Sequence, residues 1–158
     1  WPEERLAYAN AALAEANIAA GAALGRRDAV DRGLDMLDWL LTRQTASGHL
    51  SVTPVGGSDL LPHGARFDQQ PIEAGALADA CWRAATLTGD PRWERGVFAA
   101  WRWFEGDNDT GTVMHDAVTG GSYDGLQQVG VNSNQGAEST LALVSTRQRV
   151  TTLLEVVA

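Results

Sequence analysis

Two short polar motifs of the chain share one spacing, a glutamine followed three positions later by a glutamate. They are Gln70 and Glu73 in "FDQQPIEAGA", and Gln135 and Glu138 in "VNSNQGAEST", 65 positions further on. Each glutamate stands at the entrance of an apolar helical segment. Two carboxylates that face one cavity can act as general acid and general base, the pair that glycoside hydrolysis requires. The alternative is structural, because a first-turn glutamate bonds free backbone amides and suits the helix dipole.

Other polar residues cluster beside these motifs. "ARFDQQPIE" gathers the cation Arg66, the carboxylate Asp68 and the amide Gln69 ahead of a proline. Amides and carboxylates bind pairs of sugar hydroxyls, which favours a hydroxyl-rich ligand; the alternative is an ion pair between Arg66 and Asp68. In "GGSYDGL", Tyr123 and Asp124 project from a glycine-rich turn. They form either an aromatic platform beside an acid or only a stable turn.

Several other kinds of site are not expected. One acidic cluster begins like a calcium loop but lacks a glutamate at the twelfth position and has its glycine misplaced; it contains Asp107, Asn108 and Asp109. The histidines are too far apart for zinc-ligand spacing; they are His49, His63 and His115. Neither a G-x-S-x-G motif nor a phosphate-binding glycine loop occurs. The single cysteine, Cys81, is predicted to be a buried apolar residue. We therefore expect no metal and no cofactor.

Composition limits the partners. The chain has 158 residues, enough for one domain, with 44% apolar and 20% charged residues. Its net charge is −8, and its twelve basic residues are all arginines without a basic run, so nucleic acid and anionic membranes are not expected partners. Charges interrupt every apolar stretch before about 18 residues, so no membrane span is expected. We expect a cytoplasmic location.

The elements that carry these residues are predicted to be helices. Apolar residues recur with a period of 3.6, and no segment sustains the period-2 alternation of a strand. The chain is therefore predicted to be all-α, with at most short β pieces in its loops. The periodicity predicts helices over 3–24, 28–44, 71–88, 91–105 and from about Gln135 onward.

The helices also repeat as hairpins. "ALAEANIAAGAALG" aligns without gaps on "ALADACWRAATLTG", and "RGLDMLDWLL" falls on "RGVFAAWRWF". Turns within each hairpin are tight, whereas the connections 45–70 and 106–134 are long, which is uncommon unless a loop is functional. Both long connections leave and enter helices at the same end of the bundle. That end also holds the two glutamine–glutamate motifs, so it is the predicted functional end.

Five sequence motifs of the chain carry a resemblance to a known family. They are "HLSVTPVGG", "FDQQPIEAGALADAC", "TGDPRW", "WFEGDND" and "GGSYDGLQQVGVNSNQGAESTLALVST". These motifs resemble the helical domain that follows the glycosyltransferase domain in bacterial two-domain proteins. That domain is similar to the α/α-toroid, or six-hairpin, proteins of carbohydrate metabolism. The resemblance implies that two sets of residues line the ligand side, namely His63, Asp68, Gln69, Gln70 and Glu73, and Tyr123, Asp124, Asn132, Asn134, Gln135 and Glu138.

The chain departs from that family in its length. A complete six-hairpin ring has more than twice the predicted number of helices, and the βα pattern of a nucleotide-sugar site is absent. Residues 1–158 are therefore expected to form one helical domain, the C-terminal portion of a larger toroid. An open part of a ring exposes apolar flanks on its first and last helices, which predicts self-association or a missing N-terminal toroid segment.

The expected function is that of a carbohydrate-active, glycosidase-like toroid domain whose saccharide binds at the end formed by loops 45–70 and 106–134. The catalytic candidates are Glu73, Glu138, Asp68 and Asp124. The ligand-binding candidates are His63, Arg66, Gln69, Gln70, Tyr123, Asn132, Asn134 and Gln135. A non-catalytic carbohydrate-binding or scaffolding domain appended to a glycosyltransferase is the first alternative. A helical module that binds a protein through its loops is the second.

Overall fold

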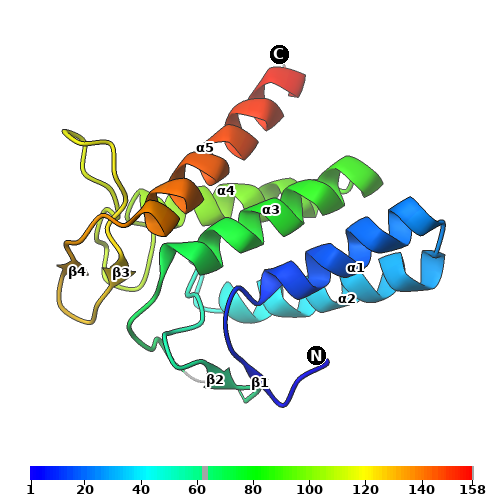
Figure 1. The fold of residues 1–158 in the computed structure, drawn as a ribbon, viewed down its shortest axis with the longest axis horizontal. Coiled ribbons are helices and arrows are strands. Elements are labelled where there is room, and N and C mark those ends of the chain that lie inside the picture. The colour runs from blue at the N-terminus through cyan, green and yellow to red at the C-terminus, as the bar shows by residue number, and fades with distance from the viewer. Residues whose placement is uncertain (62–63, 158) are drawn as a thin grey trace.

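The computed structural model of the chain describes residues 1–61 and 64–157. Within them the protein is mostly helical, as predicted, with four two-residue strands in the loops (Figure 1). The helices are α1 (Ala11–Leu24), α2 (Arg27–Gln44), α3 (Pro71–Thr88), α4 (Pro91–Phe104) and α5 (Ala137–Val157). The strands are β1 (Arg5–Leu6), β2 (Ser58–Asp59), β3 (Gly125–Leu126) and β4 (Val131–Asn132).

The helices are arranged around α3. α1 and α2 pack as one antiparallel pair, α3 and α4 as a second, and α3 also contacts α1 and α5. Figure 1 shows both tight turns at one end of the molecule and both long connections at the other, where α3 and α5 begin. We call this second end the loop end; it comprises residues 45–61, 64–70 and 106–134 and the first turns of α3 and α5.

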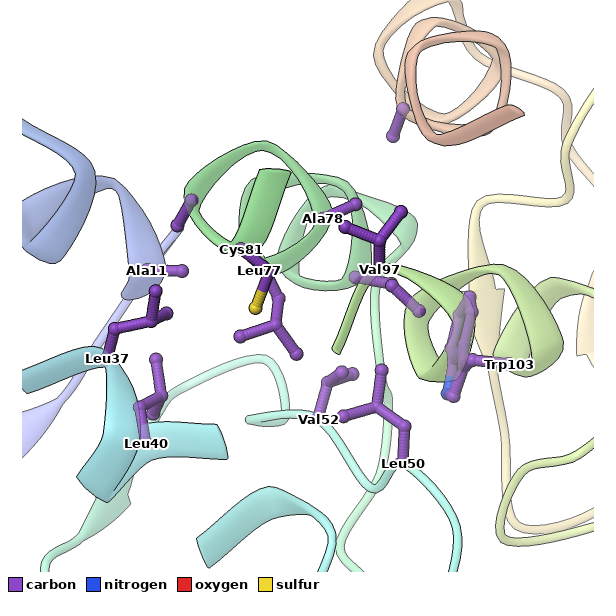
Figure 2. Close-up of a cluster of buried hydrophobic side chains, with 14 of the residues drawn as sticks. Ala11, Leu37, Leu40, Leu50, Val52, Leu77, Ala78, Cys81, Val97 and Trp103 are labelled. Carbon is purple, nitrogen blue, oxygen red and sulfur yellow. The ribbon is translucent and has the colours of Figure 1, made fainter. Parts of the chain in front are cut away.

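The core lies between the two helix pairs and beneath the loops (Figure 2). Leu37 and Leu40 of α2, Leu77 of α3 and Trp103 of α4 are almost completely buried. Cys81 is also fully buried, as predicted, and burial raises the pKa of its thiol because the thiolate loses its hydration there. Such a thiol packs as a small apolar residue.

Small residues bring α5 close to α3. A Cβ placed on Gly75 would lie only 3.0 Å from Cβ of Ala142, so the two helices cross almost backbone to backbone. An added methyl group there would have to push α5 away. This close crossing holds the first turn of α5, with Glu138, beside the first turn of α3, with Glu73.

The prediction for the first helix was wrong at its start. Residues 3–10 do not extend α1; instead Arg5 and Leu6 pair as β1 with Asp59 and Ser58 of β2. Leu6 enters the core from this strand, and Asn10 Oδ1 accepts the Ala7 N–H at 2.8 Å, which ends the extended segment just before α1. The fifth helix begins two residues later than predicted, at Ala137, and runs without a break to Val157.

Candidate functional site

Glu73 bonds the start of another helix rather than its own. Its Oε1 accepts the backbone N–H of Ala9 at 2.5 Å, and its Oε2 accepts from Nδ2 and the backbone N–H of Asn10 at 3.0 and 3.3 Å. The first amides before a helix have no partner within it, so a carboxylate from α3 stabilises α1 here. The sequence predicted that Glu73 could cap its own helix; in the structure it accepts the hydrogen bonds of another helix, α1.

Burial changes the acidity of this carboxyl. Glu73 is only 5% exposed, and the loss of hydration raises the pKa of its carboxyl, although the three hydrogen bonds lower it in part. A carboxyl with a raised pKa is suited to donate a proton. Both of its oxygens are, however, already engaged by protein donors.

Tyr8 bonds Glu138 and lies near Glu73. Its hydroxyl donates to Oε2 of Glu138 at 2.5 Å, and 56% of the residue is exposed. The hydrogen bond to Glu138, burial, and the charges of Glu138 and Glu73 together raise the pKa of Tyr8 to about 12. Both predicted glutamates therefore lie close to one phenol group. Tyr8 was not a predicted site residue, because its segment was expected to be part of a helix.

A cavity of about 370 Å³ lies beside Tyr8 and Glu73. Its other lining residues are Arg5, Ala7, Gln70 and residues 53–56. Gln70 is the N-cap of α3 but makes no side-chain cap bond, and no hydrogen bond from its amide is found within the described residues. We call Tyr8, Gln70, Glu73, Glu138 and this cavity the rim site.

The ionisation of Tyr8 gives a direct check of the rim site. Raising the folded-state pKa above the usual value of 10.0 means that the folded protein holds this proton more tightly. The contribution of Tyr8 to stability is therefore constant below about pH 10 and is lost as pH rises toward about 12. In an ultraviolet titration, Tyr8→Phe should remove a phenol that ionises near pH 12. Glu138→Gln should move that ionisation down toward its usual pH, and an unchanged ionisation would exclude the contact.

Asp68 and Asn132 lie together on the exposed surface of the loop end. A Cβ placed on Gly125 would be 3.8 Å from Cβ of Asp68 and 3.9 Å from Cβ of Asn132. Gln69 and Leu126 exchange both backbone hydrogen bonds at 2.8 and 2.9 Å, and so join the two long loops at this point. Asp68 and Asn132 thus flank Gly125 as two exposed polar side chains from positions far apart in sequence.

Asp124 and its neighbours hold the loop that leads into α5. Asp124 accepts from the backbone of Gly136 at 2.8 Å and from Asn134 Nδ2. Burial acts to raise the pKa of its carboxyl, but hydrogen bonds from Ser139, Asn134 and Gly136 outweigh it, so the pKa is lowered. Gln135 is engaged elsewhere and donates to Asp116 at 3.2 Å.

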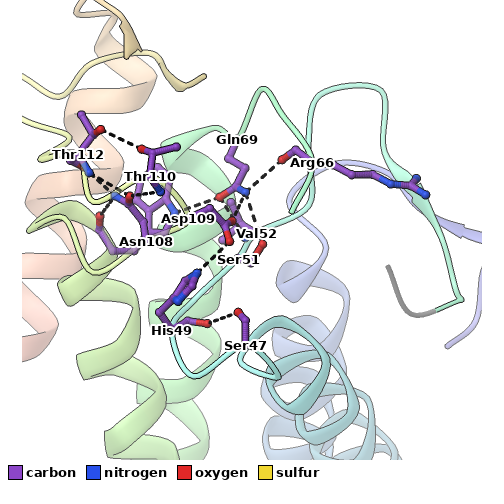
Figure 3. A network of polar contacts seen from close by, with 11 residues as sticks. Ser47, His49, Ser51, Val52, Arg66, Gln69, Asn108, Asp109, Thr110 and Thr112 are labelled. Carbon is purple, nitrogen blue, oxygen red and sulfur yellow. Dashed lines mark hydrogen bonds and ion pairs between the residues drawn. The ribbon is translucent and has the colours of Figure 1, made fainter. Parts of the chain in front are cut away.

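Gln69 lies inside a polar network rather than at a ligand surface (Figure 3). It is fully buried, and its Nε2 donates to Asp109 Oδ2 at 2.5 Å, while Asp109 Oδ1 lies 2.8 Å from Nε2 of His49. Its Oε1 accepts from the indole of Trp103 at 3.2 Å. The network links both long loops to α4. Asp109, which the sequence placed in a cluster that begins like a calcium loop, thus bonds Gln69 and His49 within this network.

The remaining predicted residues are dispersed. Arg66 is exposed and pairs with Asp59 at 3.9 Å, not with Asp68. Tyr123 is half-buried and packs against the core. His63 lies outside the described residues. In the part of the chain that the structure describes, no three or more His, Cys, Asp or Glu residues are grouped so that they can hold a metal ion.

Comparisons with known proteins give no match for this chain, either to a family model or to a curated protein sequence. Across residues 1–61 and 64–157, no helix is both long and apolar enough to cross a membrane. The function is therefore argued from the rim site itself.

Proposed function

We propose that the chain is a helical carbohydrate-binding domain, part of an α/α toroid, whose saccharide binds at the rim site. The observation that carries the proposal is the position of Tyr8, an exposed ring that borders a cavity with the amide of Gln70 and the carboxylate of Glu138 beside it. Ligand cavities of roughly 300–1,000 Å³ combine apolar surface with a few polar groups that fix orientation. An aromatic face suits the C–H face of a sugar ring, and the amide and carboxylate suit its hydroxyls.

Binding is favoured over hydrolysis because of what the candidate catalytic groups contact. Both oxygens of Glu73 accept hydrogen bonds from the start of α1. Asp124 accepts hydrogen bonds around the start of α5. A general acid must come within hydrogen-bond reach of the bond it protonates, and groups with these partners would first have to release them. Scaffolding and saccharide binding need no such release.

Glycosidase-like chemistry is the second candidate, and the burial of Glu73 favours it. A carboxyl whose pKa is raised by burial is suited to act as a general acid, and Tyr8, which bonds Glu138, also feels the charge of Glu73. In this reading Glu73 donates the proton and Glu138 activates water. Glu138→Gln should then reduce turnover by about 10²-fold or more, with saccharide affinity retained. Absence of hydrolysis by the unchanged protein would reject this candidate and leave the binding proposal intact.

Exposed apolar residues support the toroid part of the proposal. Large apolar side chains are solvent-exposed on α1 and α5, the two helices at the flanks of the bundle; they are Leu13, Leu24, Leu141, Val144 and Leu154. Apolar side chains that stay exposed on the outer helices of a bundle favour association. We infer that further toroid helices or a second copy cover these flanks.

Isothermal titration calorimetry with gluco-, manno- and galacto-configured oligosaccharides tests the saccharide site. Tyr8→Ala and Gln70→Ala should each weaken binding roughly tenfold, since each removes contacts worth about 1.4 kcal/mol. Gln148→Ala is the matched control, because Gln148 is an exposed glutamine on α5 away from the rim cavity. Equal affinity of the three variants would reject the rim site.

A further inference from the structure

A second cavity, of about 320 Å³, lies between α2 and α4 and shares no residue with the rim site. Three arginines of α4 line it, namely Arg92, Arg95 and Arg102. Its floor includes Gly96 and Ala99. Asp38 and Leu41 of α2 line the opposite side, and Asp107 completes the cavity. We call it the arginine pocket.

The spacing on α4 explains how the pocket forms. Residues 92, 95, 99 and 102 fall on one face of a helix with 3.6 residues per turn. The small residues Gly96 and Ala99 leave a hollow between the longer arginines. Gly96 cannot be larger, because a Cβ there would lie 2.5 Å from Sγ of Cys81 and 3.2 Å from Cδ2 of Leu41. The hollow thus follows from the packing of α4 on α2 and α3.

Two of the arginines are held in place by acidic partners. Arg92 donates to Asp38 at 2.8 Å and lies 3.2 Å from Asp90, while its guanidinium stacks 4.0 Å from the ring centre of Trp93. Arg102 lies 3.3 Å from Asp107. A guanidinium has five N–H donors, so each pair fixes the side chain and leaves donors for a further acceptor.

Arg95 differs from the other two arginines of the pocket. It is exposed, and no acidic partner for it is found among the described residues. The two carboxylates that line the pocket, Asp38 and Asp107, are each engaged by another arginine. Three arginines line one hollow in a chain with a net charge of −8 and no lysine, and a net negative charge disfavours the binding of anions in general.

We propose that the arginine pocket binds the phosphate group of a small molecule. Phosphate offers several oxygens to forked guanidinium donors, and such charge-assisted hydrogen bonds are the strongest that side chains make. The volume lies at the lower end of the range for ligand cavities, which fits one phosphorylated metabolite of a few carbons or inorganic phosphate. The proposal does not rest on the saccharide site, which lies elsewhere on the surface.

Titration of the isotope-labelled protein at low ionic strength, followed by NMR through the arginine Nε–H signals, tests this proposal. The probes are inorganic phosphate, glucose 6-phosphate and glucose. Both phosphates should shift the Arg95 and Arg102 signals, and glucose should not. Tighter binding of glucose 6-phosphate identifies a phosphorylated small molecule as the ligand, whereas equal or tighter binding of inorganic phosphate identifies the free ion. Either result supports a phosphate site.

Arg95→Gln should weaken phosphate binding about tenfold, or about 1.4 kcal/mol, because it removes a charge-assisted hydrogen bond to the phosphate. Ala99→Asp should abolish binding by placing a carboxylate in the floor. Arg147→Gln is the matched control, since Arg147 is an exposed arginine on α5, and it should bind phosphate as the unchanged protein does. No shift with either phosphate, or equal weakening by Arg95→Gln and Arg147→Gln, would overturn the proposal.

Discussion

Gln69→Leu is expected to lower the free energy of unfolding by about 3–4 kcal/mol, the largest loss for any polar residue of the loop end. The leucine fills a similar volume but removes every hydrogen bond of the amide. The Val52 backbone N–H, the Trp103 indole and the Asp109 carboxylate would then lose a partner in a buried place. Each buried polar group left without a partner costs about 1–3 kcal/mol. Urea denaturation followed by tryptophan fluorescence measures the loss.

Gln44→Leu is the matched control. Gln44 is also buried, at 5% exposure, but the only hydrogen bond of its side chain found in the described residues joins Nε2 to Thr53 at 3.2 Å, and its Oε1 has no partner there. The leucine also removes a buried oxygen that has no partner, which offsets the loss of the bond to Thr53, so this variant should change stability by less than about 1 kcal/mol. Equal effects of the two substitutions would show that the Gln69 network does not hold the loops.

Glu73→Ala is expected to lower the free energy of unfolding by about 2–4 kcal/mol, because three donors at the start of α1 lose their acceptor. Glu138→Ala, the control, removes a carboxylate at the surface whose bond to Tyr8 is exposed. It should cost no more than about 1 kcal/mol. Thermal and urea unfolding of both variants measure the difference. If Glu73→Ala were as stable as Glu138→Ala, the contact with α1 would be unimportant, and a purely catalytic role for Glu73 would be favoured.

The pH dependence of the Glu73 effect has a definite sign. Burial raises the folded-state pKa of its carboxyl above the unfolded value. The carboxyl therefore contributes most to stability below the unfolded pKa, and that contribution is lost as pH rises through the folded pKa. The stability of the unchanged protein relative to Glu73→Gln should therefore fall as pH rises. If the unchanged protein instead became more stable relative to Glu73→Gln as pH rises, the raised pKa of Glu73 would be contradicted.

The middle helices could be predicted because their signals are local. α3 begins at Pro71 and α4 at Pro91, each with proline at the first helical position, and α3 ends before Gly89, which has a left-handed backbone with φ of 67°. The start of α1 could not be predicted in this way. It depends on Glu73, which lies more than sixty residues away in sequence, and apolar periodicity carries no information about such a contact.

The candidate site was also predictable only in part. The shared spacing of the two motifs predicted Glu73 and Glu138 at one end of the molecule, and both lie near Tyr8. Sequence reasoning did not find the burial of Gln69, because its partners come from a distant loop and from α4. Likewise, the sequence shows that Arg92, Arg95 and Arg102 share one face of α4. It does not show that residues of α2 lie opposite them and close the pocket.

The most direct test of the saccharide site is an NMR titration of the backbone amide signals with the oligosaccharide that calorimetry selects. We expect the largest shifts at Tyr8, Gln70 and Glu138, with little change on α4 around Arg95. Shifts confined to other parts of the molecule, or no shifts with any sugar of the panel, would contradict the proposed function.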